Sequence, residues 1–288
     1  MRNIRLIIEY DGTDFNGWQA QERTSARAHK STSKRLKTVQ GEIEKAAKKL
    51  FGKYISLIGA GRTDAGVHAK AQVANFRIDS NLPLNKIKNG LNSFLTRRIS
   101  IISAEEVTLR FHSRLDSKGK LYKYTILNRR ARSPLLEKYA AFVPYGLNII
   151  AMKKASGYLI GRKDFKSFQT SDKKEKDSVR VIKKIEIIER SESFPTSHPE
   201  EHIRGVYPER QRRAQCKLRD EGSRIIEIYI QANGFLYNMA RAIAGTLIEV
   251  GRGRFKPEKV KEILEEKHRP SAGQTAPAKG LCLEKVFY

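Results

Sequence analysis

The spacing of apolar residues in the first part of the chain predicts alternating strands and helices. Residues 4–10 (IRLIIEY) have strand composition, and turn residues follow them directly. Behind Thr38, apolar residues recur at helical spacing. Two further strands enclose a glycine-rich loop, a second helix is predicted from near Pro83, and a last strand begins at Ile99. The order strand, helix, two strands, helix, strand predicts a ferredoxin-like subdomain over residues 1–107.

The second part of the chain repeats this order of elements without detectable sequence identity. Its predicted elements are a strand at 121–127, a helix from Ile149, strands at 179–189 and 224–232, a helix within 235–251 and a strand from Leu281. These elements predict a second ferredoxin-like, or RRM-like, subdomain over residues 108–288. We therefore expect an α+β fold in which the two sheets join into one mainly antiparallel sheet. Helices would cover one face, and the active-site cleft would lie between the subdomains.

Two polar segments interrupt the pattern. Residues 22–37 are basic and have hardly any apolar anchor, so they predict a loop or insertion. Residues 193–222 have the composition of a disordered loop and separate two predicted strands. Within this polar insertion, His198, Glu201 and His202 fit the H-x-x-E-H zinc-peptidase pattern. The proline in HPEEH and the missing apolar face argue against the helix that the pattern requires, so we predict no metal site.

The charge balance indicates a polyanionic partner. The chain has 288 residues, 57 Lys and Arg against 31 Asp and Glu, a formal net charge of +26 and an isoelectric point near 10.1. This excess of positive charge is typical of proteins that bind nucleic acid. An anionic membrane surface would also attract it, but the sequence has no long apolar span and no basic amphipathic helix with bulky aromatics. We therefore predict nucleic acid as the partner and no membrane association.

The cysteines and the N-terminal residues indicate the cellular compartment in which the protein is expected. Cys216 and Cys282 are the only cysteines, which supports neither a disulfide framework nor a cysteine-based zinc site. The N-terminal residues MRNIRLIIEYDG place charges inside a short apolar run and pass directly into a predicted strand, which argues against a signal peptide. Both observations predict a cytoplasmic protein.

The stretch GAGRTDAGVHAKAQVANF, residues 59–76, has a composition that plain core packing does not require. Its glycines place Asp64 on a tight loop between two strands. Arg62 lies two residues away, and its positive charge would keep the Asp64 carboxylate ionised. An ionised carboxylate suits a nucleophile or a base. Alternatively, Asp64 and the glycines could serve only the positive-φ positions of a hairpin.

Two nucleotide-binding loops that share glycine spacing with this stretch can be excluded. Gly59 and Gly61 begin a G-x-G-x-x-G pattern, but Asp64 stands in place of its third glycine. Gly61 and Gly66 begin a phosphate-loop pattern, but Val67 and a histidine replace its Lys and Ser or Thr. We therefore predict no nucleotide cofactor.

The motif GRTDAGVHA resembles the signature of the TruA-type tRNA pseudouridine synthases. Five further blocks resemble this family in the same order along the chain: YDGTDFNGWQAQ, NGLNSFL, FHSRLDSKGKLYKY, GFLYNMARAIAG and AKGLCLEKVFY. The two polar segments are longer than the family pattern leads us to expect. The resemblance covers most of the chain and implies an isomerase.

Carried over position by position, the resemblance makes Asp64 the catalytic aspartate and Arg62 its loop partner. Tyr122 matches the aromatic residue that stacks on the target base, and Arg241 matches the arginine that pairs with the aspartate. The implied reaction detaches a uracil from its ribose, rotates it and rejoins it through carbon, with no cofactor and no metal. The implied substrate is uridine in the tRNA anticodon arm, at tRNA positions 38–40. The implied assembly is a homodimer with a joint eight-stranded antiparallel sheet.

The residue types suit this chemistry, although each has a structural alternative. A tyrosine ring could recover part of the cost of unstacking a uridine, but either Tyr122 or Tyr124 could instead belong to the core. Arg241 lies on an otherwise apolar helix face, where an unpaired charge is costly, so we expect an acidic partner or an RNA phosphate. We expect His68 and His112 to form local hydrogen bonds. A non-catalytic RNA-binding protein on a doubled RRM-like scaffold is the alternative function.

Overall fold

The computed structural model describes residues 1–19, 37–170, 177–191 and 223–288. The basic segment at 22–37, except for its last residue, and the polar insertion at 193–222 lie outside these residues, as does the HPEEH motif. The elements of the first half are β1 (Arg2–Tyr10), α1 (Val39–Phe51), β2 (Ile58–Gly59), β3 (His68–Ile78), α2 (Leu84–Phe94) and β4 (Ile99–Val107). The elements of the second half are β5 (Gly119–Asn128), β6 (Ala141–Val143), α3 (Ile149–Gly157), β7 (Gly161–Asp164), β8 (Val179–Ser191), β9 (Arg224–Ala232), α5 (Met239–Gly251), α6 (Lys259–Glu266) and β10 (Leu281–Phe287).

Both halves have the same spatial order of strands. In the first half β1 lies between β4 and β3, and β2 pairs with the other edge of β3. In the second half β5 lies between β10 and β9, and β8 pairs with the other edge of β9. Each half therefore places its first strand beside its fourth and third, which is the repeat that the element order predicted. The fold is α+β, and its pairs within each of these two four-strand sets are all antiparallel.

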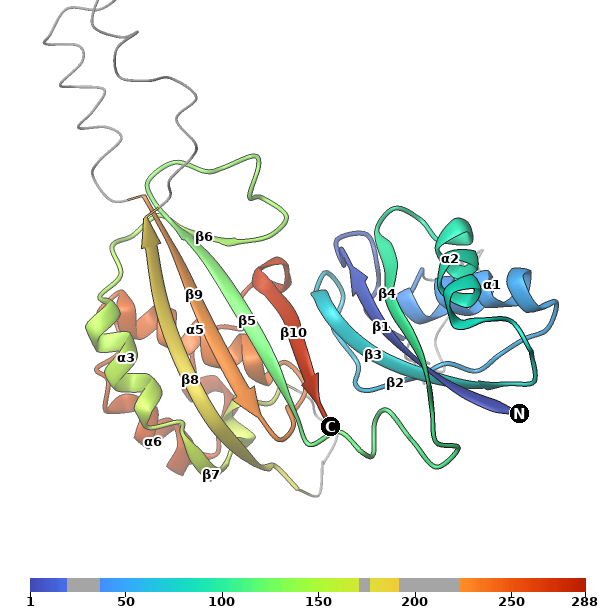
Figure 1. The fold of residues 1–288 in the computed structure, drawn as a ribbon. Coiled ribbons are helices and arrows are strands. Elements are labelled where there is room, and N and C mark those ends of the chain that lie inside the picture. The colour runs from blue at the N-terminus through green and yellow to red at the C-terminus, as the bar shows by residue number, and fades with distance from the viewer. Residues whose placement is uncertain (20–36, 171–176, 192–222) are drawn as a thin grey trace, which may run out of the picture.

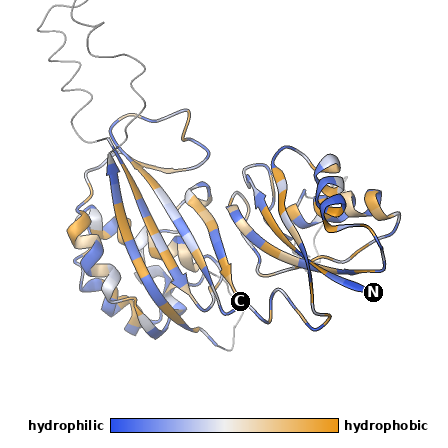
Figure 2. Ribbon diagram, viewed as in Figure 1, coloured by the Kyte–Doolittle hydropathy of each residue, from blue (hydrophilic) through white to orange (hydrophobic). Residues whose placement is uncertain are grey.

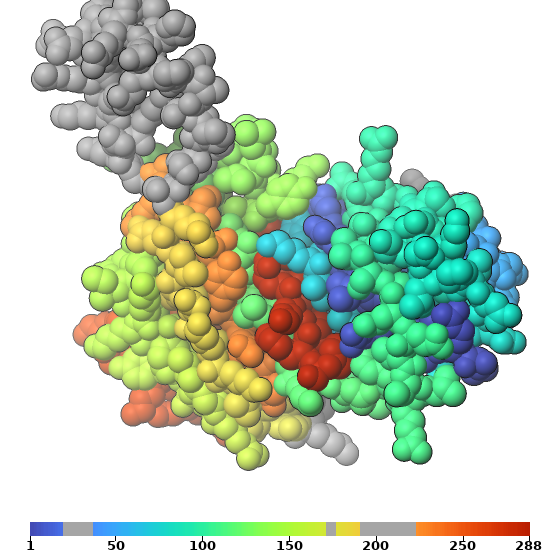
Figure 3. Space-filling view, in the orientation of Figure 1, coloured from blue at the N-terminus to red at the C-terminus, as the bar shows by residue number. Residues whose placement is uncertain are grey.

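The two halves join through the edge of β3, where the sheet is parallel. His68 and Ala69 at the start of β3 pair with Cys282 and Leu283 of β10. Farther along the same edge, Ala74 pairs with β2 instead. Strands β10 and β2 thus pair with different parts of the same edge of β3. The loop between β2 and β3 lies where the pairing changes from one strand to the other. Figure 3 shows β10 and its neighbouring residues filling the space between the two halves.

Helices cover the sheet and bury its apolar side chains. In Figure 1, α3, α5 and α6 lie behind β5, β9 and β8, whereas α1 and α2 lie beside β1 and β4. Figure 2 shows apolar and polar residues alternating along the strands, as expected for a sheet with one covered face. Ile4, Leu6 and Ile8 of β1 are fully buried, as are Ile226 and Ile228 of β9. An apolar layer therefore lies between sheet and helices in both halves, and its buried residues form one continuous cluster.

Local signals account for several element boundaries. Helix α1 begins after Thr38, whose side chain accepts a hydrogen bond from the Gly41 backbone N–H at 3.2 Å. Gly52 ends the same helix with a left-handed backbone, φ 72°. The prediction of a helix behind Thr38 is thus confirmed together with its cap.

The sheet differs from the expected eight antiparallel strands in two respects. Within the described residues it has ten strands, because β2 and β6 pair with β3 and β5 in addition to the eight strands that lie side by side from β4 to β7. The pairs β3–β10 and β5–β6 are parallel. The elements β6, β7 and α6 were not predicted. Among the described residues, no helix combines the length and the apolar character needed to cross a bilayer.

We propose that the boundary between the subdomains lies at residues 107–108. Strand β4 ends at Val107 and completes the pairing of β1. The Asn3 side chain then donates hydrogen bonds to the carbonyls of Thr108 and Phe111, at 2.9 and 3.0 Å. The chain leaves the first half along these contacts and enters β5.

Helix α5 packs so closely on the segment before β10 that a glycine is required at the contact. A Cβ atom at Gly245 would lie 1.8 Å from the Gln274 carbonyl oxygen. We predict that Gly245→Ala destabilises the fold by roughly 1–3 kcal/mol through overpacking. Gly157→Ala is the matched control, because no atom lies within 4 Å of a Cβ at that position near the end of α3. Urea unfolding should separate the two variants, and equal midpoints would contradict the packing argument.

Candidate active site

The loop of residues 60–67 is held by hydrogen bonds to β3 at its first end and by one within the loop at its second end. The Ala60 N–H donates to the Val73 carbonyl at 2.7 Å, and the Val67 N–H donates to the Asp64 carbonyl at 3.1 Å. The Gln72 side-chain amide donates to the Gly61 carbonyl at 2.8 Å. These bonds satisfy backbone groups that would otherwise be unpaired in a partly buried loop. Asp64 therefore projects from a loop whose backbone is held in place.

The segment after β1 supports the same loop from the other side. The Trp18 N–H donates to the Thr63 carbonyl at 3.1 Å, and the Tyr10 hydroxyl shares a hydrogen bond of 2.7 Å with the Thr63 hydroxyl. Gly17 has φ 82°, and a Cβ there would lie 2.4 Å from the Thr63 carbonyl oxygen. Trp18 is buried and belongs to the apolar core. The sequence GWQ thus supports the Asp64 loop by backbone contact.

Arg241 reaches the loop from the first turn of α5. Asn238, immediately before this helix, has a left-handed backbone with φ 60°. Its side-chain oxygen accepts a hydrogen bond from Arg241 Nη1 at 2.8 Å, and the Ala276 carbonyl accepts one from Arg241 Nε at 2.8 Å. The Ala276 N–H in turn donates to the Arg241 carbonyl at 3.1 Å. Two acceptors therefore fix the direction of the guanidinium.

The structure brings Asp64 and Arg241 together across the junction of the two halves. Arg241 Nη1 lies 3.4 Å from Asp64 Oδ2, and the side chains are 18% and 21% exposed. Burial raises the pKa of the Asp64 carboxyl above its ordinary value, and the charge and hydrogen bond of Arg241 oppose that rise. The other carboxylate oxygen, Oδ1, has no hydrogen-bond partner in the described part of the chain. The contact with Arg241 therefore occupies only one oxygen of the carboxylate.

Arg62 does not supply the positive charge that we expected beside Asp64. Its Nε donates to the side-chain oxygen of Gln19 at 3.0 Å, on the exposed side of the loop. Arg241 is the cation whose charge acts on the Asp64 pKa. Two residues along a loop do not fix the relative direction of two side chains, so the expected pairing was wrong. A role for Arg62 in the site stays a prediction.

Tyr122 and Tyr124 point to the same face of β5, and both are largely buried. Tyr122 is 6% exposed, and its ring meets the Phe235 ring edge-on with the centroids 4.9 Å apart. Burial raises the pKa of the Tyr122 hydroxyl, with further contributions from Tyr10 and from the charge of Asp64. Tyr124 is fully buried and donates to the Pro277 carbonyl at 2.9 Å. Tyr124 is therefore a core residue, whereas Tyr122 lies within the electrostatic reach of Asp64.

Comparison with known proteins identifies the family. A family model described as tRNA pseudouridine synthase matches residues 6–116 and 155–288. The chain belongs to the tRNA pseudouridine synthases. The synthase is therefore an isomerase that converts uridine to pseudouridine in tRNA, and not the non-catalytic RNA-binding protein that we considered as an alternative. The resemblance to TruA-type enzymes is confirmed.

Relatives are similar along the full length. "tRNA pseudouridine synthase A 2" of Clostridium tetani is 42% identical over 287 residues, covering 100% of this chain and 99% of the relative. The protein of the same name in Clostridium perfringens is 42% identical over 288 residues, with both chains fully covered. "tRNA pseudouridine synthase A" of Caldicellulosiruptor saccharolyticus is 43% identical over 288 residues, again with full coverage of both chains.

The two histidines beside the matched motifs have local structural roles, as expected. The Gly12 N–H donates to His68 Nδ1 at 3.1 Å, and His68 Nε2 forms a hydrogen bond of 2.9 Å with the Lys138 carbonyl. His112 Nδ1 accepts from the backbone N–H groups of Arg114 and Leu115, both at 3.2 Å. His68 thereby ties the start of β3 to the segment before β6.

Sequence reasoning missed Asn238 as a residue that positions Arg241. The signal was present, because Asn238 and Arg241 are three residues apart at the start of a helix, a spacing that brings side chains together. The contact of Arg241 with Ala276 had no such signal, since 35 residues separate the two.

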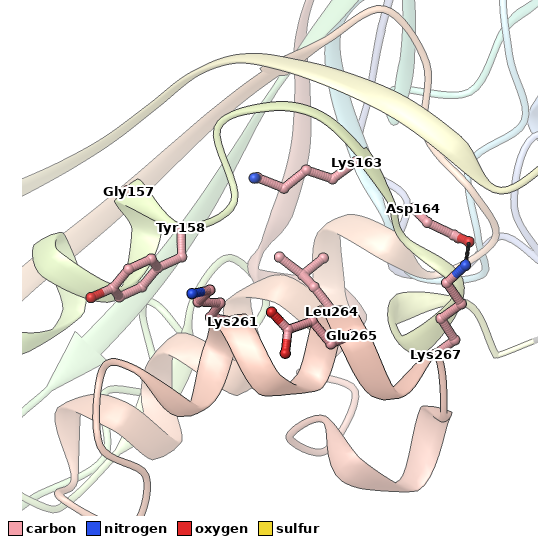
Figure 4. Close-up of a pocket in the computed structure, with 8 residues that line it drawn as sticks. All are labelled: Gly157, Tyr158, Lys163, Asp164, Lys261, Leu264, Glu265 and Lys267. Atoms are coloured by element: carbon pink, nitrogen blue, oxygen red, sulfur yellow. Dashed lines mark ion pairs between the residues drawn. The ribbon is translucent and has the colours of Figure 1, made fainter.

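A shallow pocket elsewhere in the synthase is separate from this site. Figure 4 shows it between the end of α3, β7 and α6, with Lys163, Lys261 and Glu265 among its lining residues. An ion pair of 3.1 Å between Lys267 and Asp164 closes one side. None of the lining residues contacts Asp64 or Arg241 in the structure, so the pocket lies outside the site.

Proposed function

We propose that Asp64 is the reacting carboxylate of the synthase and that Arg241 holds it charged and directed. The supporting observation is the ion pair of 3.4 Å between the Asp64 loop and the first turn of α5. In the conversion, the bond between uracil N1 and the ribose breaks, and a bond between C5 and the same ribose carbon forms. The proton on C5 leaves, and N1 gains one. A carboxylate with a free oxygen can attack, stabilise positive charge at the sugar or accept a proton in this sequence.

We infer that Tyr122 contacts the uracil that enters the site. A uridine must leave its stack before its glycosidic bond can be reached, and an aromatic ring recovers part of that cost. Tyr122 lies on the strand next to β10, and the charge of Asp64 acts on its hydroxyl. Because the ring is 6% exposed and meets Phe235 edge-on, stacking on the base requires that Phe235 move when the base arrives.

We further infer that the target uridines lie in the anticodon stem-loop, at tRNA positions 38–40, and that the synthase acts as a homodimer. Both inferences rest on the resemblance of the six sequence blocks to the TruA-type enzymes. The net charge of +26 supports extended contact with the tRNA backbone. Chemical mapping of pseudouridine in tRNA transcripts tests the first inference. Sedimentation equilibrium of the full chain tests the second.

We predict that Asp64→Asn abolishes pseudouridine formation while tRNA affinity stays within a few fold. The amide is nearly isosteric with the carboxylate but carries no charge and is not nucleophilic. Product would be mapped in unmodified tRNA transcripts at single turnover, with Asp14→Asn as the control because Asp14 is exposed and pairs with Arg98. Turnover by Asp64→Asn at the rate of the control would rule out the proposed role.

We predict that Tyr122→Leu slows single-turnover conversion more than it weakens tRNA binding. Leucine keeps apolar volume but loses the ring face, whose stacking contributes about 1–3 kcal/mol per base. Tyr122→Phe should retain the wild-type rate. Tyr124→Leu controls for damage to the fold, because Tyr124 lies on the same strand face and is fully buried. Equal losses of rate in the two leucine variants would assign Tyr122 to the core.

A further inference from the structure

Lys120 lies against the loop that carries Asp64. It is two residues before Tyr122 on β5, so both side chains point to the same face of the sheet. A Cβ atom at Gly61 would lie 3.0 Å from Lys120 Cε and 3.2 Å from Lys120 Nζ. Because Gly61 has no Cβ, the end of the Lys120 side chain can lie directly against the loop. The ammonium group is placed at the entry of the loop, three residues before Asp64.

Lys120 has no counterion in the described part of the synthase. No carboxylate of the described residues lies within ion-pair distance of its Nζ, and no hydrogen bond of Nζ is formed with them. Burial lowers the pKa of the Lys120 ammonium, and the charge of Arg114 lowers it further. The side chain is half-buried. It is a desolvated cation beside a second cation.

Lys123, three residues later, shows the opposite situation on the other face of the same strand. Its Nζ lies 3.1 Å from Glu227 and 3.5 Å from Glu284. The hydrogen bond and charge of Glu227 raise the pKa of Lys123 although burial opposes the rise. One strand therefore has two half-buried lysines, of which one is neutralised by carboxylates and the other is not.

A desolvated cation without a partner costs folding free energy, and a ligand anion can remove that cost. The partner that the +26 charge and the family indicate is an RNA backbone, whose anionic groups are phosphates. We propose that the Lys120 ammonium binds a phosphate next to the uridine that enters the site, so that the RNA supplies the missing counterion. Lys120 is then a positioning residue that ties the target nucleotide to the Asp64 loop. This inference rests on the proposed function of the Asp64 site.

A neutral linkage in the RNA provides the sharpest test. Three tRNA substrates would be compared. The first carries a methylphosphonate on the 5′ side of the target uridine, the second carries one on its 3′ side, and the third has only unmodified phosphates. Wild type should lose single-turnover efficiency by about tenfold or more with one of the neutral linkages, as for a lost hydrogen bond between charged groups. Lys120→Met should show that loss with the unmodified RNA and no further loss with the same neutral linkage.

Lys123→Met serves as the matched control and should keep the wild-type sensitivity to the neutral linkage. The slope of log affinity against log salt should fall by about 0.7–0.9 in Lys120→Met, as for one phosphate contact. If Lys120→Met is as sensitive as wild type to both neutral linkages, the proposal is overturned. Turnover by Asp64→Asn at the wild-type rate would instead defeat the proposed function of the Asp64 site, so the two failures are distinguishable.

Stability without RNA tests the premise separately. Lys120→Met keeps the apolar stem and removes the uncompensated charge, so its thermal midpoint should rise above that of wild type. Lys123→Met leaves Glu227 and Glu284 without this partner, so its midpoint should fall. A lysine with a lowered folded-state pKa destabilises the fold below that pKa, and its effect disappears as pH rises to the unfolded value. The gain in Lys120→Met should therefore shrink at alkaline pH, and a midpoint below wild type at neutral pH would contradict the proposal.

Discussion

The shared edge of β3 is the constraint on which the rest of the synthase depends. An edge strand presents unpaired backbone groups, and here two different partners satisfy them in succession. Strand β2 pairs near Ala74, and β10 pairs at His68 and Ala69. The chain that connects β2 to β3 must leave the sheet where one partner ends and the other begins. Asp64 lies on that connection and is thereby placed at the junction of the halves.

The ion pair between Asp64 and Arg241 orients the carboxylate more than it stabilises the fold. A partly buried pair gains little net free energy, because desolvation of both charges offsets their attraction. The distance of 3.4 Å is also longer than a strong charge-assisted hydrogen bond. Arg241 makes its shorter bonds to Asn238 and Ala276 and is therefore held in place independently of Asp64. A guanidinium fixed in this way can orient a carboxylate without occupying all of its acceptor sites.

Sequence patterns predicted most helices and strands because their signals are local. The buried stripe of α1, its cap at Thr38 and the alternation in β5 each lie within about a dozen residues. The glycines likewise placed Asp64 on a loop. The short strands β6 and β7 had too few residues for a period to show, and the parallel pairing of β3 with β10 depends on contacts between distant segments. No local pattern specifies such a register.

The site shows the same limit. The resemblance to a known family joined Asp64 to Arg241, which are 177 residues apart, and the structure places them in contact. Residue spacing alone suggested Arg62 instead, and the structure turns that side chain toward Gln19. The missing counterion of Lys120 is a property of the folded chain that the sequence does not display. Pairing of charges, unlike periodicity, is decided by tertiary structure.

The pH dependence of single-turnover conversion tests most directly whether Arg241 keeps Asp64 charged. Burial raises the pKa of Asp64 and Arg241 lowers it, so the acidic limb of the rate should lie above the ordinary aspartate value of 3.8. Arg241→Gln should move this limb to higher pH, whereas Arg62→Gln should leave its position unchanged. A limb that stays in place in Arg241→Gln, or that moves equally in both variants, would contradict the account.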